Sequence, residues 1–282
     1  MVTQKPKLVW VEGTEARPGL AGLWKFLDDY LKSQAEPDFD VSYVAFPRAA
    51  GGVRQLAPRL LSETLGLTAA QVAAEQGADL VIFNDWAMPI HAARSHLDVP
   101  VTGVAEASAI LGNVLAQRPA VVTVAEGLRW GFERDLRDFG LVQRMVHPPV
   151  WWLDPQSTHE DIQEAVVDAA AFVERFDAVA RKAVAAGADA ILVGCGYLGP
   201  TLTAADYRNV TGHPDIPVYD CTRLAFELGV ALYRLSSAGV SPSRVGFARP
   251  SQTGSTAVAD VLNHLQVVGG ARKQLLTQVL GV

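Results

Sequence analysis

Short apolar runs alternate with longer stretches of helical periodicity along most of the chain. The runs are apolar throughout, which is typical of strands buried on both faces of a parallel sheet. They predict strands at residues 8–11, 41–46, 80–83, 99–104, 120–124, 141–146, 190–193 and 216–219. The intervening periodicity predicts helices at residues 18–32, 69–75, 89–96, 105–115, 127–138, 159–186, 222–236 and 256–265.

This alternation predicts an α/β fold in which helices cover both faces of a parallel sheet. In such sheets, ligands bind in the crevice at the carboxyl ends of the strands. Polar residues gather at those ends, so we expect a site near Glu12-Gly13-Thr14, Asn84-Asp85, Thr123, Cys195-Gly196 and Asp220-Cys221.

Two segments of the chain share one sequence pattern. Residues 77–86 (GADLVIFNDW) and 187–196 (GADAILVGCG) align without a gap, which places Asp85 opposite Cys195. Each segment leads to a second matched strand, with the sequences DVPV and DIPV. A chain that repeats half of its fold in this way is expected to form a cleft with one titratable group on each wall.

The boundary between the two halves is expected near Gln117-Arg118-Pro119. The sequence therefore predicts a first α/β lobe over residues 1–117 and a second α/β lobe over residues 118–221. The segment from about 222 to 282 is a candidate to pack back on the first lobe.

Composition narrows the function classes. The chain has 282 residues, 49% of them hydrophobic and 19% charged, with a net charge of -6 and both signs interspersed. No basic stripe or apolar run of about 18 residues is present, so neither nucleic acid nor a membrane is an expected partner. Two cysteines and a start without a signal-peptide core indicate free thiols in the cytoplasm. Without GxGxxG, Walker or zinc-type spacing, no nucleotide cofactor or metal is expected.

Cys195 is the first candidate for chemistry. It follows an apolar run and is flanked by Gly194 and Gly196, so the backbone there can approach a ligand and its N–H groups can hold an anion. The same N–H groups are expected to lower the pKa of the thiol. The structural alternative is a small buried residue at a strand end.

Asp85 is the second candidate. Its structural alternative is a helix N-cap, a common use of aspartate after a strand. The register with Cys195 favours function, because a carboxylate and a thiol that face one carbon can remove a proton on one face and return it on the other.

Other polar and aromatic residues at the strand ends are candidates for substrate binding. Thr14 and Thr123 have helix capping as the alternative, Glu106 has stabilisation of a first helical turn, and Trp86 and Tyr197 have core packing. The full set of expected binding residues is Glu12, Thr14, Asn84, Trp86, Glu106, Thr123, Gly196 and Tyr197.

The two strand-turn copies resemble the aspartate/glutamate/hydantoin racemase superfamily, most of all its hydantoin-racemase branch. The resemblance covers most of residues 8–240 and is strongest at 187–195, 100–107 and 216–220. It implies two similar lobes related by a pseudo-twofold axis, an active site between them, no cofactor, and one cysteine per lobe acting as acid or base. Cys195 matches the second cysteine, and by resemblance Thr123 and the Gly196 turn are candidates to hold the substrate carboxylate or carbonyl and the enolate.

The first cysteine of the family pattern is missing. The ungapped alignment places Asp85 there, while a shift anchored on Val99-Pro100 places Asn84 there. With Asp85, racemisation by two unequal bases stays possible. With Asn84, only Cys195 delivers protons, a pattern that resembles the arylmalonate decarboxylase branch.

The leading expectation is a cofactor-independent racemase or isomerase that moves a proton next to a carbonyl of a hydantoin-like or small carboxylic acid substrate. The alternatives are a one-cysteine lyase, a hydrolase in which Asp85 activates water or Cys195 is the nucleophile, and a binding protein without catalysis. Residues 241–282 are candidates to cover the site or to form an oligomer contact, so a second copy of the chain is a candidate partner.

Overall fold

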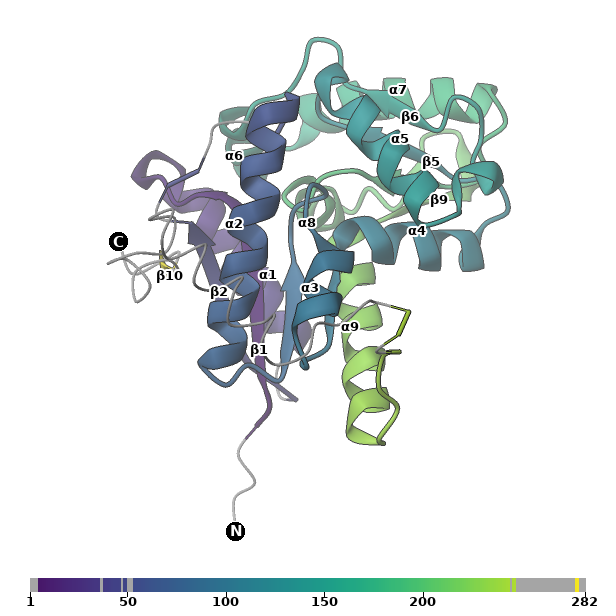
Figure 1. Ribbon diagram of the computed structural model, residues 1–282. Helices are drawn as coiled ribbons and strands as arrows, with labels where there is room; N and C mark the ends of the chain where they lie inside the picture. Colours follow the sequence, from purple (N-terminus) through teal and green to yellow (C-terminus); the bar gives the residue numbers. More distant parts are fainter. Residues whose placement is uncertain are drawn as a thin grey trace.

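The chain folds into two α/β lobes (Figure 1). The computed structural model describes residues 5–35, 38–46, 48–49, 53–243, 245–246 and 277–278. The first sheet has the strand order β10-β2-β1-β3-β4 and the second β6-β5-β7-β9-β8. The strands are β1 (Lys7–Glu15), β2 (Asp40–Phe46), β3 (Leu80–Phe83), β4 (Val101–Gly103), β5 (Ala120–Thr123), β6 (Val150–Trp152), β7 (Ile191–Val193), β8 (Asn209–Val210), β9 (His213–Tyr219) and β10 (Thr277–Gln278).

The two sheets repeat one arrangement of parallel strands. β1 pairs with β2 and β3, and β3 pairs with β4; in the second sheet β5 pairs with β6 and β7, and β7 pairs with β9. β3 and β7, which carry the repeated sequence, therefore hold the same place in their sheets. The predicted α/β fold with two similar lobes is confirmed.

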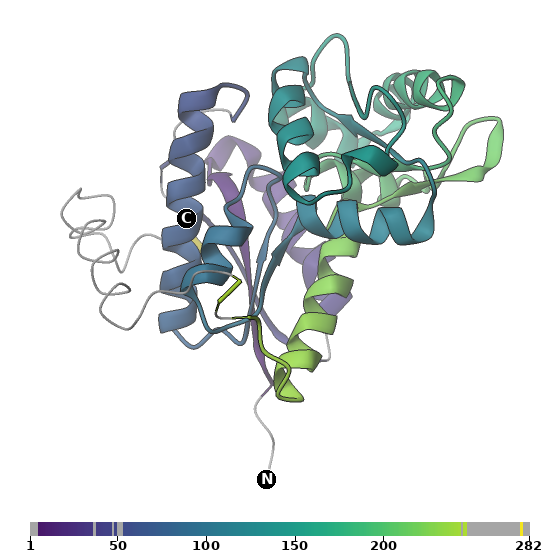
Figure 2. The same ribbon diagram turned by 45° about the vertical axis from the view of Figure 1, so that its right-hand side comes forward.

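Helices flank both sheets. They are α1 (Ala21–Ala35), α2 (Leu56–Glu75), α3 (Ile90–His96), α4 (Val104–Leu115), α5 (Arg129–Asp138), α6 (His159–Val167), α7 (Ala170–Ala185), α8 (Leu198–Ala204) and α9 (Cys221–Ser237), with 3-10 turns at Pro18–Leu20, Glu126–Leu128 and Val142–Arg144. α9 follows the last strand of the second lobe but runs down beside the first, where it contacts α4, β3 and β4 (Figure 2).

One predicted strand is wrong. Residues 141–146 contain the 3-10 turn Val142–Arg144, and the place beside β5 is taken by β6. Gly140, with φ of +72°, ends α5, and the N–H of Leu141 returns to the carbonyl of Leu136. The Arg144 guanidinium then bonds to the Asn113 carbonyl at 2.7 Å, which holds the turn against α4.

Two predicted helices differ in extent from the observed ones, and a third cannot be compared. α2 begins at Leu56, well before the predicted 69–75, because its first turns leave large apolar residues exposed and lack a clean periodicity. The predicted helix 159–186 is two helices, since the chain breaks at Asp168 between α6 and α7. The predicted helix 256–265 lies outside the described residues.

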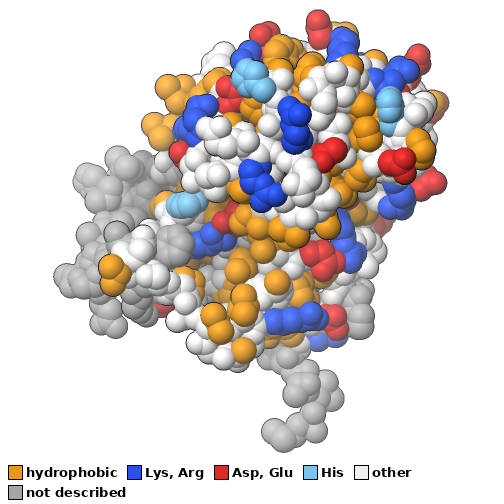
Figure 3. Space-filling view, turned by 90° about the vertical axis from the view of Figure 1, so that its right-hand side faces the viewer, with side chains coloured by type: hydrophobic (Ala, Val, Ile, Leu, Met, Phe, Trp, Pro, Cys, Tyr) orange, Lys and Arg blue, Asp and Glu red, His pale blue; other side chains and the backbone are white. Residues whose placement is uncertain are grey.

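The molecular surface carries interspersed charges. On the face shown in Figure 3, Lys and Arg side chains alternate with Asp and Glu side chains, and hydrophobic side chains lie between them. Within the described part of the chain, no helix is long and apolar enough to cross a bilayer, and no cluster of His, Cys, Asp and Glu side chains could hold a metal ion.

Candidate active site

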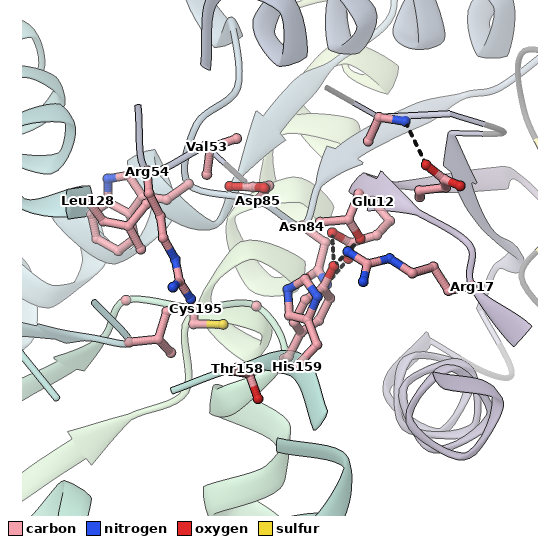
Figure 4. Close-up of a pocket in the computed structure, with 18 of the residues that line it drawn as sticks. Glu12, Arg17, Val53, Arg54, Asn84, Asp85, Leu128, Thr158, His159 and Cys195 are labelled. Atoms are coloured by element: carbon pink, nitrogen blue, oxygen red, sulfur yellow. Dashed lines mark hydrogen bonds between the residues drawn. The ribbon is translucent and has the colours of Figure 1, made fainter. Parts of the chain in front are cut away.

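A cavity of about 490 Å³ lies at the carboxyl ends of the central strands of both lobes. Eight of its lining residues are among those expected from the sequence: Glu12, Thr14, Asn84, Asp85, Trp86, Cys195, Gly196 and Tyr197. In Figure 4, Asp85 and Cys195 approach the cavity from opposite sides. The two repeated segments therefore place the Cys195 thiol and the Asp85 carboxylate in the same cavity.

The turn that carries Cys195 is anchored on several sides. The Gly194 N–H donates to the carbonyl of Val122 on β5, and the Thr123 hydroxyl donates to the Gly194 carbonyl at 2.9 Å. The carbonyl of Cys195 accepts from the Cys221 thiol at 3.2 Å. Thr123 is buried and does not line the cavity, so in this structure its hydroxyl supports the turn from behind.

The Cys195 thiol is held in its protonated form. Burial raises its pKa to about 12, and the negative charges of Asp85 and Glu12 add to the effect. Hydrogen bonding from the backbone N–H groups of Leu198 and Tyr197 acts the other way but is outweighed. The expectation of a lowered thiol pKa is therefore wrong, and Cys195 is placed to donate a proton.

Asp85 faces the cavity with a carboxyl group of altered acidity. Its Oδ1 accepts from the Ala87 N–H at 2.9 Å. Burial raises its pKa, while the N–H groups of Ala87 and Trp86 and the positive charge of Arg59 lower it. The side chain lies on Gly13, where a Cβ would be 2.5 Å from Oδ2, so only glycine leaves room for this carboxylate.

The side chain of Asn84 is engaged within the protein. Its Nδ2 donates to Glu12 at 2.9 Å, and its Oδ1 accepts from the Thr222 hydroxyl at 3.2 Å. Asn84 is almost fully buried, whereas Asp85 is partly exposed to the cavity. Of the two residues that the alignments offered in place of the missing cysteine, Asp85 is the one with a group available to a ligand.

Glu12 is the centre of a buried hydrogen-bond network. Its Oε1 accepts from the Tyr197 hydroxyl at 2.6 Å and from the Gly13 N–H at 2.7 Å. Its Oε2 accepts from the Tyr43 hydroxyl and from Asn84 Nδ2, both at 2.9 Å. Four donors around one carboxyl group fix the cavity wall where the two lobes meet, because Tyr197 comes from the second lobe and the others from the first.

Opposing effects set the charge of Glu12. Burial is the largest, and together with the nearby Asp85 it raises the pKa of Glu12 to about 7. The three side-chain donors of the network favour the carboxylate and limit the rise. Glu12 is therefore sensitive to any charge change at Asp85.

The remaining expected residues divide between the cavity and its surroundings. Trp86 lines the cavity and stacks on Phe132 of the second lobe, with ring centroids 4.4 Å apart. Glu106 does not line it: its carboxylate pairs with the Arg94 guanidinium and accepts from Thr102 at 2.9 Å. This buried pair joins α3 to the start of α4.

The cavity residues that were not predicted from the sequence include Arg17, Arg54 and His159. Arg54 donates to the Ser157 carbonyl at 2.7 Å, and Figure 4 shows both guanidinium groups directed into the cavity. Burial and the two arginines lower the pKa of His159 to about 4, so its ring is neutral. Of these three residues, only His159 lies next to a recognisable sequence pattern, because the capping box of Thr158 and Asp161 indicates a helix start there.

The family described as Asp/Glu/Hydantoin racemase matches residues 26–229. The chain belongs to this family of racemases. A hydantoin racemase of Pseudomonas sp. (strain NS671) is 28% identical to it over 173 residues, which are 61% of this chain and 67% of that relative. The protein is thus an enzyme of a racemase family, and the resemblance inferred from the repeated segments is confirmed at the level of the family.

Solved structures of racemases share the fold. An allantoin racemase from Klebsiella pneumoniae superposes with a TM-score of 0.69 at 19% identity, covering 88% of this chain and 95% of the other. An allantoin racemase from Pseudomonas fluorescens gives 0.67 at 19% identity, covering 87% and 97%. At this identity the likeness extends to the two-lobed architecture of racemases and not to the substrate.

Proposed function

We propose that this racemase-family enzyme inverts a carbon centre next to a carbonyl without a cofactor, using Cys195 and Asp85 as its two proton carriers. The observation that supports this most directly is their placement: equivalent strand ends of the two lobes present a thiol and a carboxylate to one cavity. A carbon acid held between them has one proton carrier on each face.

In the proposed reaction the proton moves from Asp85's side of the carbon to Cys195's side by two transfers. Asp85 as a carboxylate takes the proton from carbon, and the C–H electron pair moves to the carbonyl to form an enolate. The Cys195 thiol then gives its proton to the opposite face, which leaves a protonated Asp85 and a Cys195 thiolate. In this state the enzyme can convert the opposite enantiomer by the reverse steps. Alternatively, Asp85 and Cys195 exchange protons with solvent and return to their starting forms.

Charge coupling lowers the cost of the unusual thiolate. The negative charge of Asp85 is one of the effects that raise the pKa of Cys195. Once Asp85 has accepted a proton this charge is gone, so the thiol ionises more readily at the moment it must donate. The N–H groups of Tyr197 and Leu198 stabilise the thiolate, and we assign the N–H of Gly196 to the enolate oxygen.

The cavity walls favour a ring or short chain with one apolar substituent. Leu128, Trp86 and Phe132 form an apolar and aromatic wall, and Arg17 and Arg54 offer cationic donors on the polar side. Such a combination fits a hydantoin-like ring or a small carboxylic acid whose carbonyl or carboxylate faces the guanidinium groups.

A one-base lyase is the second candidate, because the first lobe carries no thiol at the equivalent place. There Cys195 alone would protonate an enediolate left by the loss of carbon dioxide. The raised pKa of Cys195 is compatible with a proton donor in either reaction.

Proton NMR in deuterium oxide separates the two. Single enantiomers of substituted hydantoins, aspartate and glutamate, and a set of arylmalonates, are incubated with the wild type and with Cys195→Ser, Asp85→Asn and Asp29→Asn. Asp29 is an exposed carboxylate on α1 and serves as the matched control. We expect α-proton wash-out with loss of optical rotation, a drop of about 10²–10⁴-fold in both site variants, and wild-type rates for the control.

Other outcomes would redirect the assignment. If Asp85→Asn forms a decarboxylated product from an arylmalonate at the wild-type rate, the enzyme is a lyase. Near-normal loss of optical rotation, or near-normal decarboxylation, in Cys195→Ser would exclude both proposals, and no turnover of any substrate would favour hydrolysis or binding.

A further inference from the structure

Arg59 is a buried arginine that joins the two lobes. It lies on α2 of the first lobe and is only 1% exposed. Its Nε donates to Glu63 on the same helix at 3.0 Å, and its Nη2 donates to Asp135 on α5 of the second lobe at 2.6 Å. Its Nη1 is buried and has no hydrogen-bond partner within the described ranges.

A second arginine completes this inter-lobe network. Arg134 on α5 donates to Glu63 at 2.8 Å and to Asp135 at 3.2 Å. The two carboxylates are therefore shared by two guanidinium groups, one from each lobe. Arg134 differs from Arg59 in being 38% exposed at its side chain, so it provides an exposed arginine for comparison within the same network.

The network lies directly behind the candidate active site. The Arg59 guanidinium packs on Gly131 of α5, where a Cβ would be only 2.2 Å from Nη1. The next residue, Phe132, stacks on Trp86, which follows Asp85 in the chain. α5 therefore links Arg59, through Gly131 and Phe132, to the residue that follows Asp85 in the chain.

Arg59 also acts on Asp85 through its charge. Burial raises the pKa of Asp85, and the positive charge of Arg59 opposes that rise. The other titratable groups that interact with Asp85 are Glu12 on β1 and Cys195 in the turn after β7, and both become negative when they ionise. Arg59 counteracts these acids from outside the cavity, although Asp135 and Glu63 partly neutralise it. Arg17 and Arg54 are cations that line the same cavity as Asp85.

We propose that Arg59 is a positioning residue of this site, which holds α5 against α2 behind Asp85 and favours the carboxylate of Asp85 through its positive charge. This inference rests on the proposed function, in which Asp85 is the base that first accepts the proton. Arg59 itself touches neither the substrate nor the reacting atoms.

Two network variants give opposite expectations. Arg59→Met removes the charge and should move the ionisation of Asp85 to higher pH. Asp135→Asn also breaks the inter-lobe bond but leaves Arg59 with less of its charge neutralised, so the ionisation of Asp85 should stay in place or move to lower pH. A role in packing alone would predict the same direction for both variants.

The titration is read directly, without turnover. Carbon-13 NMR of protein labelled at aspartate Cγ follows Asp85, whose signal is assigned by its loss in Asp85→Asn. Arg134→Met, which removes the exposed arginine of the same network, should leave the Asp85 midpoint unchanged. If Arg59→Met is too unstable to study, the titration of Asp85 is measured in Arg59→Lys, which keeps the charge, and in Asp135→Asn.

The results separate this inference from the proposed function. An unshifted Asp85 midpoint in Arg59→Met, or equal shifts in Arg59→Met and Arg134→Met, would overturn the role of Arg59 even if the enzyme is a racemase. If racemisation is found, the acid limb of its kcat/KM profile should follow the NMR midpoint to higher pH in Arg59→Met. If the Asp85 midpoint moves in Arg59→Met but no racemase activity is found, the effect of Arg59 on Asp85 stands and the proposed reaction is rejected.

Discussion

At the scale of single residues, the surroundings of His159 disfavour protonation of its ring. The ring packs edge-on against Tyr197, with centroids 5.0 Å apart, and burial together with Arg17 and Arg54 lowers its pKa from 6.5 to about 4. In the unfolded chain His159 binds a proton as the pH falls through 6.5, whereas in the folded protein it does so only near pH 4. The free energy of unfolding therefore decreases, through His159, as the pH falls from 6.5 to about 4.

His159→Gln should remove this loss. Relative to the wild type, the variant should gain stability as the pH falls from 6.5 to 4, with an upper limit of about 3 kcal/mol at roughly 1.4 kcal/mol per pKa unit. Glu12, whose pKa is raised, acts in the opposite direction in both proteins and cancels in the difference. Urea unfolding across this range measures it, with exposed His213→Gln as control; parallel curves for His159→Gln and wild type would contradict the argument.

Much of the candidate site could be predicted at the residue scale, but not its charge states. Cys195 and Asp85 are visible because each follows an apolar run at the same point of a repeat. Arg17 and Arg54 lie in loops without a pattern and reach the cavity only through the folding of the chain. The pKa of Cys195 was predicted in the wrong direction, because local N–H groups can be read from the sequence while burial by the opposite lobe cannot.

At the scale of elements, the turn after β7 touches the end of β3. A Cβ on Gly196 would lie 2.1 Å from the backbone carbonyl oxygen of Asn84. The Gly196 carbonyl also accepts from Thr222 at the start of α9, at 3.0 Å. The repeated strand ends thus meet backbone to backbone, and glycine is required here for space.

Gly196→Ala should force these two turns apart. We expect a loss of about 1–3 kcal/mol in the free energy of unfolding, typical of overpacking, together with a loss of activity because Cys195 moves with the turn. Gly22→Ala on α1 is the matched control, since its Cβ would meet Gln163 at an ordinary 3.6 Å and should be neutral or stabilising. Chemical denaturation and turnover assays on both variants decide the point; equal stabilities would refute the close approach.

Elements were predictable where the sequence repeats and less so elsewhere. β3 and β7 follow from matched apolar runs, and β9 from its match to the strand after β3. Residues 141–146 were assigned as a strand because their apolar content resembles that of β6, which lies only a few residues further on. Local pattern does not decide which of two neighbouring runs enters the sheet; the left-handed Gly140 and the bond from Arg144 do.

At the scale of the whole molecule, Asp220 lies where the chain crosses from the second lobe back to the first. Its Oδ1 accepts from the N–H groups of Thr222 and Arg223 and so caps α9. Its Oδ2 accepts from the Tyr30 hydroxyl of α1 and from Thr203 of α8. One partly buried carboxylate therefore connects helices of both lobes, and its desolvation raises its pKa.

Asp220→Ala should weaken the molecule as a unit. Loss of the cap costs about 0.5–2 kcal/mol and loss of the bonds to Tyr30 and Thr203 about 1 kcal/mol each, so we expect a decrease of roughly 2–4 kcal/mol. Tyr30→Phe removes only the inter-lobe bond and should cost about 1–3 kcal/mol. The double variant should be less destabilised than the sum of the two, by the coupling energy of the Tyr30–Asp220 bond. Urea unfolding of the four proteins measures this cycle; strict additivity would show that the Tyr30–Asp220 hydrogen bond does not stabilise the contact between α1 and α9.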